Sequence, residues 1–166
     1  MSPAPLFRPL APSDAADVGA LHARVFGPGR FARTAYRVRE DTAPVSPYCR
    51  GAFIGAHLAA ALRMTEVTIG GIDGALLLGP LAVDPAFANQ GHGRRLIAEV
   101  IDSARAAGMR LIVLVGDEPY YGRLGFKRIP PGRIRLPGPV DPARLLALEL
   151  VPSALEQYQG LVTARR

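Results

Sequence analysis

The sequence predicts an α/β fold in which a mixed β-sheet of about six to seven strands is flanked by about four helices. Three observations support this prediction. Two apolar segments, 48–54 and 58–69, are separated by a tight glycine turn and are typical of a hairpin. Arg94–Ala107 places its apolar residues on one helical face, and Leu111–Val115 is a continuous aliphatic run. Strand, helix and strand in this order predict parallel pairing, so the sheet is expected to be antiparallel early and parallel at its centre.

The other elements are expected in order along the chain. Pro12-Ser13-Asp14 offers a cap for a helix that runs to about Val25. Gly79-Pro80 interrupts an apolar strand, and because proline donates no hydrogen bond to a ladder, it indicates a bulge or a parting from the neighbouring strand. The remaining expected elements are strands at Leu6–Leu10, Ala75–Val83, Phe126–Ile129 and Leu145–Leu150, a helix at Phe31–Glu40, a helical turn at Tyr120–Leu124 and a loop at Pro130–Val140.

The composition is that of a globular protein, with 49% hydrophobic and 20% charged residues. No repeat or interdomain linker interrupts it, so residues 1–166 are expected to form a single domain. The apolar runs are shorter than the roughly 20 residues that span a bilayer, and the N-terminus lacks the order of a signal peptide. The protein is therefore expected to be cytoplasmic and not to bind a membrane.

The net charge of +6 is carried almost wholly by arginine, since Lys127 is the single lysine. A basic surface attracts polyanions in general. No basic stripe interleaved with aromatic residues is present, however, so nucleic-acid binding is not favoured. Cys49 is the single cysteine and excludes an internal disulfide. His22, His57 and His92 lack the spacing of metal ligands, so no metal is expected.

The strongest chemical signal is the segment Leu81–Arg95, which follows an expected strand and opens the expected helix. Gly91 and Gly93 let the backbone turn so that successive N–H groups converge at the positive end of the helix dipole. That arrangement binds phosphate oxygens. Arg94 and Arg95 add positive charge beside it.

Phosphate binding alone leaves more than one cofactor open. A Walker loop is excluded because no Gly-Lys-Ser/Thr ending is present. A dinucleotide fingerprint would use Gly91 and Gly93, with Asp117 after the next strand as the ribose-binding acid. Its third position is Leu96 where glycine or alanine is wanted, but a dinucleotide-binding oxidoreductase stays an alternative.

The same segment resembles motif A of the GCN5-related N-acetyltransferase (GNAT) family: Ala-Val-Asp-Pro, a short loop, Gln-Gly-x-Gly-Arg and an apolar helix. In that family, backbone amides of the loop hold the pyrophosphate of coenzyme A. Ala88 stands where the family has glutamine or arginine, which removes one side-chain contact and leaves the backbone donors. The resemblance implies a phosphate cradle made of Asn89, Gln90, Gly91, His92, Gly93 and Arg94.

A second family hallmark is a tyrosine four residues before Gly-Phe, and Tyr121 precedes Gly125-Phe126 at this spacing. The resemblance extends from about Leu76 to Lys127, and the tail Asp141–Pro152 resembles a bacterial branch of acetyltransferases. It implies a GNAT-like fold with acetyl-CoA as the acetyl donor and an amine as the acceptor. Family members are often dimers, so a homodimer stays open, and the sequence does not fix the oligomeric state.

The resemblance implies direct attack of the amine on the thioester in a ternary complex. The pantetheine arm of coenzyme A would pair with free backbone groups of Leu81, Ala82 and Val83, beside the Gly79-Pro80 break. Tyr121 would protonate the leaving thiolate, since a phenol with a pKa of about 10 stays protonated at neutral pH. A non-catalytic acetyl-CoA sensor with the same binding site stays a further alternative.

The base and the acceptor site are less well defined by the sequence. Glu66 is the candidate for the general base, with His57 and Glu118 as further possibilities, and loss of the amine proton to water is the alternative. The expected helix at Phe31–Glu40 is rich in arginine. Its residues Arg33, Tyr36, Arg37 and Arg39 either line a substrate mouth or form a solvated basic face.

Overall fold

The computed structural model describes residues 3–27 and 34–165. Within these residues nine strands form a sheet of order β1-β2-β3-β4-β5-β8-β6, and β9 pairs with both β3 and β7. The strands are β1 (Leu6–Pro9), β2 (Arg50–Ile54), β3 (His57–Ile69), β4 (Ile72–Val83), β5 (Leu111–Val115), β6 (Lys127–Arg128), β7 (Ile134–Arg135), β8 (Leu145–Glu149) and β9 (Gly160–Ala164).

The pairing directions confirm the predicted mixed sheet. β1, β2, β3 and β4 form an antiparallel series. At the centre β4 and β5 are parallel, as the strand, helix and strand order requires, and β8 returns antiparallel to β5. The predicted interruption at Gly79-Pro80 is a bulge within β4, where the register with β3 shifts between the Leu81–Leu62 and Leu78–Met64 pairs.

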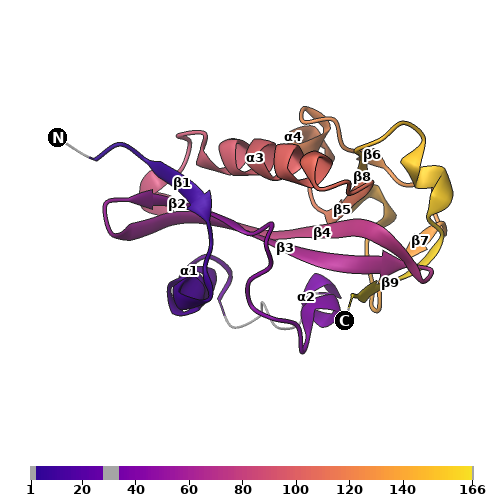
Figure 1. Cartoon of the computed structure of the whole chain (residues 1–166), viewed down its shortest axis with the longest axis horizontal. Helices are drawn as coiled ribbons and strands as arrows, with labels where there is room; N and C mark the ends of the chain where they lie inside the picture. Colours follow the sequence, from indigo (N-terminus) through magenta and orange to yellow (C-terminus); the bar gives the residue numbers. More distant parts are fainter. Residues whose placement is uncertain (1–2, 28–33, 166) are drawn as a thin grey trace.

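Helices cover both faces of this sheet (Figure 1). α3 (His92–Ala106) and α4 (Glu118–Gly122) lie on one face, and α1 (Ala15–Phe26) and α2 (Thr34–Arg39) lie on the other. Both faces are dry. On the α3 face Leu96 and Val100 pack with Leu76, whereas on the opposite face Leu77 packs in one cluster with Val38 of α2.

Several boundaries differ from the predicted ones. α3 begins at His92, two residues before the predicted start, because Gly91 takes a left-handed conformation with a φ of 82° and ends the preceding loop. β7 was expected to be loop, since its two residues lie in a segment rich in proline and glycine. β9 was not predicted, because it pairs with a distant strand rather than with a neighbour in the sequence. The first residues of the predicted Phe31–Glu40 helix lie outside the described part of the chain.

None of the helices within residues 3–27 and 34–165 has both the length and the apolar character needed to cross a bilayer.

Candidate active site

β4 and β5 part from one another halfway along β4. The two strands pair through Ala75–Leu77 and Leu111–Val113. Beyond that point β5 continues against β8, and β4 stays paired with β3 as far as Val83. The side of β4 that faces β5 is therefore open from Leu78 onward. This opening is the parting that Gly79-Pro80 predicts.

The alternation of an antiparallel ladder shows which peptide groups face the opening. Asp84 donates its N–H to the carbonyl of Ala59 at 2.8 Å, so Asp84 faces β3. Ala82, two residues earlier, faces β3 as well. Leu81 and Val83 therefore direct their N–H and C=O groups toward the open side.

The bulge that begins the opening is held from α2. Gly79 and Pro80 together stand opposite the single residue Arg63 of β3. The guanidinium of Arg39 donates from Nη1 to the carbonyl oxygen of Gly79 at 2.6 Å, and the Arg39 side chain is buried. Charge-assisted hydrogen bonds of this kind are stronger than neutral ones. The contact fixes the carbonyl at the point where β4 leaves β5.

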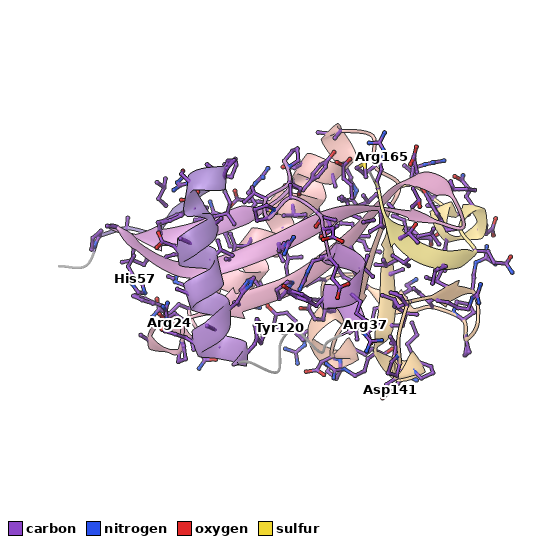
Figure 2. The ribbon with its side chains drawn as sticks, turned by 90° about the horizontal axis from the view of Figure 1, so that it is seen from below. Arg24, Arg37, His57, Tyr120, Asp141 and Arg165 are labelled. Atoms are coloured by element: carbon purple, nitrogen blue, oxygen red, sulfur yellow. The ribbon has the colours of Figure 1, made fainter. Side chains whose placement is uncertain are left out.

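A turn stabilised by Asp84 joins β4 to α3. The Asp84 carboxylate accepts the N–H of Ala86 at 3.0 Å and contacts Nε2 of His57 at 3.0 Å, and Arg24 lies 3.4 Å away. The Ala86 amide, followed by the His57 hydrogen bond, lowers the pKa of Asp84. Arg24 and His57 lie at the same end of the molecule (Figure 2). These contacts anchor the loop from its strand side.

The loop ends in a concentration of free backbone donors. Asn89 and Gly91 take left-handed conformations with φ values of 62° and 82°. The first N–H groups of a helix have no acceptor within it. Arg95 is the first residue to bond within the helix, to the carbonyl of Gly91 at 3.1 Å, so the amides of His92, Gly93 and Arg94 are available to a ligand.

These donors border a hollow of about 430 Å³. It contains no carboxylate among its lining residues, whereas Arg94 and Arg123 contribute two positive charges. A site with helix amides, two guanidinium groups and no acid favours an anion such as a diphosphate. The lining residues are Val83, Phe87, Ala88, Asn89, Gln90, Gly91, His92, Gly93, Arg94, Tyr120 and Arg123.

The side chain of His92 is buried, although His92 belongs to the expected phosphate-binding loop. It is 5% exposed, its Nε2 lies 3.2 Å from Oε1 of Gln90, and its ring packs near that of Phe7. Because the helix begins at His92, the imidazole turns inward under β1 while the amide stays at the hollow. His92 therefore supports the loop with its side chain and offers only its backbone to a ligand.

Tyr121 stands on α4, directly after β5. Its ring packs edge-on against Tyr120 and Phe126, with centroids 4.9 and 5.8 Å away. Gly116 makes room for it, since a Cβ at that position would lie 2.5 Å from Cε2 of the ring. Burial, together with the nearby Tyr120 and Asp117, raises the pKa of Tyr121 to about 12. The phenol is thus fixed in place and protonated at neutral pH.

Glu66 does not lie at the opening. It pairs with Leu76, in the part of β4 that is still joined to β5, and forms an ion pair with Arg165 at 3.6 Å. The two further candidates are also engaged, since His57 contacts Asp84 and Glu118 pairs with Arg128 at 2.9 Å. This arrangement does not favour Glu66 as a general base.

The residues of the predicted substrate mouth on α2 do not all point in the same direction. Arg39 turns inward to Gly79, and Tyr36 packs 5.2 Å from its guanidinium. Arg37 is exposed and reaches the carbonyl of Pro137 at 3.4 Å, and it is visible on this face in Figure 2. Arg33 lies outside the described residues.

Four residues of the hollow, Phe87, Ala88, Tyr120 and Arg123, were not predicted to bind the cofactor. Arg123 belongs to the Tyr-Gly-Arg-Leu-Gly-Phe motif, so its position was a usable signal. Tyr120 was expected only as part of a helical turn, but it lines the hollow, and its hydroxyl would lie 3.1 Å from a Cβ at Gly93. Phe87 comes from the turn after Asp84 and gave no signal of its own. In the part of the chain that the structure describes, no group of three or more His, Cys, Asp or Glu side chains is arranged to hold a metal ion.

The fold and the site together define an α/β protein with an anion-binding hollow at the start of α3, beside an opening between two strands of its sheet. Comparison with known proteins gives the family. The acetyltransferase (GNAT) domain family matches residues 59–128. The uncharacterised N-acetyltransferase YhbS of Escherichia coli K12 is 30% identical over 162 residues, which cover 95% of this chain and 94% of YhbS. The chain belongs to the GNAT family of acetyltransferases.

Solved structures agree with this assignment. A crystal structure of E. coli YhbS in complex with CoA matches with a TM-score of 0.81 and 28% identity, covering 99% of this chain and 93% of that one. A GNAT acetyltransferase from Brucella melitensis in complex with acetyl-CoA matches with a TM-score of 0.69 and 26% identity, covering 98% and 96%. The predicted GNAT-like fold is confirmed. The dinucleotide-binding alternative is not supported, because the largely antiparallel sheet is not doubly wound.

Proposed function

We propose that this protein is an acetyl-CoA-dependent N-acetyltransferase that transfers the acetyl group to a primary amine by direct attack in a ternary complex. The observation that carries the proposal is the parting of β4 from β5 directly before a loop rich in free amides. The two similar proteins that were crystallised with CoA and acetyl-CoA support this choice of donor.

Each part of acetyl-CoA can be assigned to residues of the site. The diphosphate would accept hydrogen bonds from the amides of His92, Gly93 and Arg94, with Arg123 adding charge. The pantetheine arm would run along the open side of β4 and pair with the peptide groups of Leu81 and Val83. Ala82, which was also predicted to bind the arm, faces β3 and is assigned no contact.

Placing both reactants in the opening makes the attack effectively intramolecular. The amine lone pair forms a bond to the thioester carbon, and collapse of the tetrahedral intermediate breaks the C–S bond. The departing thiolate takes a proton from Tyr121, the nitrogen of the new amide releases its extra proton to water, and the phenolate of Tyr121 regains a proton from water. Burial raises the pKa of the phenol, and the same lack of water raises the basicity of the thiolate, so the transfer stays feasible.

The direct route is favoured because Cys49 is unsuited to carry an acyl group. It is 1% exposed, and its sulfur lies 3.4 to 3.5 Å from the backbone N–H and carbonyl of Met64. With Glu66 held away from the opening, the attacking amine would lose its proton to water before it reacts. The rate should then rise with pH as the fraction of free amine increases.

Three measurements test the proposal. Acetyl-CoA should raise the melting temperature, whereas NADH and NADPH should not. A thiol-release assay over a panel of amines should give turnover that Tyr121→Phe lowers by about 100-fold or more, since general acid catalysis contributes at least that much. Because the pKa of Tyr121 is about 12, the pH–rate profile should show no descending limb from this group below about pH 10.

Tyr48→Phe is the matched control, because Tyr48 packs against the α3-side core near Glu66 and Arg165 and is assigned no part in the reaction. It should leave the rate within about twofold. Normal acetyl-CoA binding without thiol release for any amine would favour the non-catalytic sensor. An unchanged rate in Tyr121→Phe would remove the assignment of the general acid.

A further inference from the structure

The face from which the acceptor enters follows from the packing. On the α3 face, the opening is covered by a core that contains Leu78, Leu96, Leu114 and Phe126, with Tyr121 packed against it. The other face carries α1 and α2 (Figure 1). An amine can therefore reach a thioester held between β4 and β5 from the α1 and α2 side.

Arg63 projects from the middle of β3 onto that side. Its neighbours Leu62 and Met64 both point into the α3-side core, so the alternation of the strand directs Arg63 to the opposite face. Arg63 stands opposite the Gly79-Pro80 bulge, one strand away from the side of β4 that is open.

The guanidinium of Arg63 is half-buried and lacks a counter-charge. Its Nη2 donates to Thr42 Oγ1 at 3.1 Å and to the carbonyl of Ala43 at 3.2 Å, and both acceptors are neutral. Among the described residues, no carboxylate pairs with it and no acceptor bonds its Nε or Nη1. Burial lowers the pKa of Arg63, which is the expected cost of holding a cation there without an anion.

Thr65 gives a second, independent observation on the same face. It lies two residues after Arg63 and opposite Leu77, the last β4 residue paired with β5. Its side chain is 6% exposed, and its Oγ1 has no hydrogen-bond partner in the described part of the chain. Buried hydroxyl groups are rarely left unpaired. Two polar groups with unused hydrogen-bonding capacity thus lie beside the opening.

We propose that Arg63 binds a carboxylate of the acceptor, so that the substrate is an amine that also carries a carboxylate, such as a free amino acid. This inference rests on the proposed acetyl transfer. The fork of Nε and Nη1 matches the two oxygens of a carboxylate, and Thr65 lies next to it as a further donor. The other buried arginine of this region, Arg39, is already bonded to Gly79 and holds the bulge.

Matched acceptor pairs test this recognition, because each pair differs in the carboxylate alone: lysine and cadaverine, and phenylalanine and phenethylamine. Initial rates with acetyl-CoA should give kcat/KM about 10-fold or more in favour of the amino acid, mainly through KM. Phosphoethanolamine tests a phosphate in the same place. Its preference over the amino acids would overturn the proposal in favour of a phosphorylated acceptor.

Arg63→Gln should remove the preference by raising KM for the amino acids about 10- to 100-fold, with little change for the amines that lack a carboxylate. Arg63→Lys should restore part of it, because it keeps the charge and loses the fork. Arg105→Gln on the α3 side is the control and should keep the full preference. The melting-temperature rise with acetyl-CoA should be the same in all of these variants, which separates loss of recognition from loss of the fold.

The outcomes distinguish failure of the carboxylate site from failure of acetyl transfer. Turnover with equal kcat/KM for both members of each pair, or a preference that survives Arg63→Gln, would overturn the carboxylate site and leave acetyl transfer intact. A protein that transfers acetyl to no amine in the panel would overturn acetyl transfer itself, and the carboxylate site with it.

Discussion

The two halves of β4, Ala75–Leu77 and Leu81–Val83, are both apolar but have different surroundings. Ala75–Leu77 is fully buried and paired with β3 on one side and β5 on the other. Leu81–Val83 is paired with β3 alone, and Leu81 and Val83 are partly exposed. The bulge at Gly79-Pro80 separates the halves. The first half therefore stabilises the fold, whereas the second half has backbone groups that a ligand can use.

The largest effect is expected in the paired half. Leu76→Ala removes a fully buried side chain that packs between β4 and α3, and it should lower the free energy of unfolding by about 2–5 kcal/mol. The affinity of the folded fraction for acetyl-CoA should stay within about threefold. Chemical denaturation and isothermal titration calorimetry measure the two quantities.

Leu81→Ala is the matched change in the open half. Leu81 is only partly buried against the same core, so the loss of stability should be clearly smaller than for Leu76→Ala. Equal losses of stability from both variants would contradict the division of β4 into a structural half and a ligand-binding half.

The next effect concerns the residue that holds the bulge. Arg39→Met replaces the donor to the Gly79 carbonyl and should lower the free energy of unfolding by about 1.5–3 kcal/mol, the range for hydrogen bonds to charged groups. The affinity for acetyl-CoA should fall as well, because the bulge starts the opening. Arg37→Met is the control on the same helix. Since Arg37 is exposed and its hydrogen bond is long, it should change stability by less than about 0.5 kcal/mol.

The sequence predicted those helices and strands whose apolar residues follow a local pattern. Leu96 and Val100 recur at helical spacing, and Leu111–Val115 is apolar throughout, so α3 and β5 were expected near their observed positions. The pairing of β9 with β3 joins residues about a hundred positions apart and leaves no local pattern. Contacts of this kind depend on the assembled sheet.

In the candidate site, too, features with a local sequence pattern were predicted, and features that depend on distant contacts were not. The loop at Gly91 was predicted because glycine spacing before a helix is a local signal. The inward turn of His92 was not, since it depends on Phe7 of a distant strand. The pairing of Glu66 with Arg165 and the lack of a counter-charge for Arg63 are likewise tertiary facts. The sequence shows which side chains are charged, but it does not show which of them form ion pairs in the folded protein.

The smallest effect tests the alternation along β4 itself. Proline removes the N–H of the residue it replaces. Val83→Pro therefore removes a donor that faces the opening, while the ladder with β3 keeps its hydrogen bonds. The Kd for acetyl-CoA should rise about 5- to 10-fold, since one net hydrogen bond contributes about 1 kcal/mol. The loss of stability should be modest, because only the free edge of the strand changes.

Ala82→Pro is the decisive comparison, because its N–H faces β3. This change removes a buried ladder bond, so it should destabilise the fold more than Val83→Pro and leave the affinity of the remaining folded protein nearly unchanged. The two variants are adjacent in sequence and opposite in expected effect. A similar loss of affinity in both variants would mean that the arm of coenzyme A does not form its hydrogen bonds selectively with the peptide groups that face the opening.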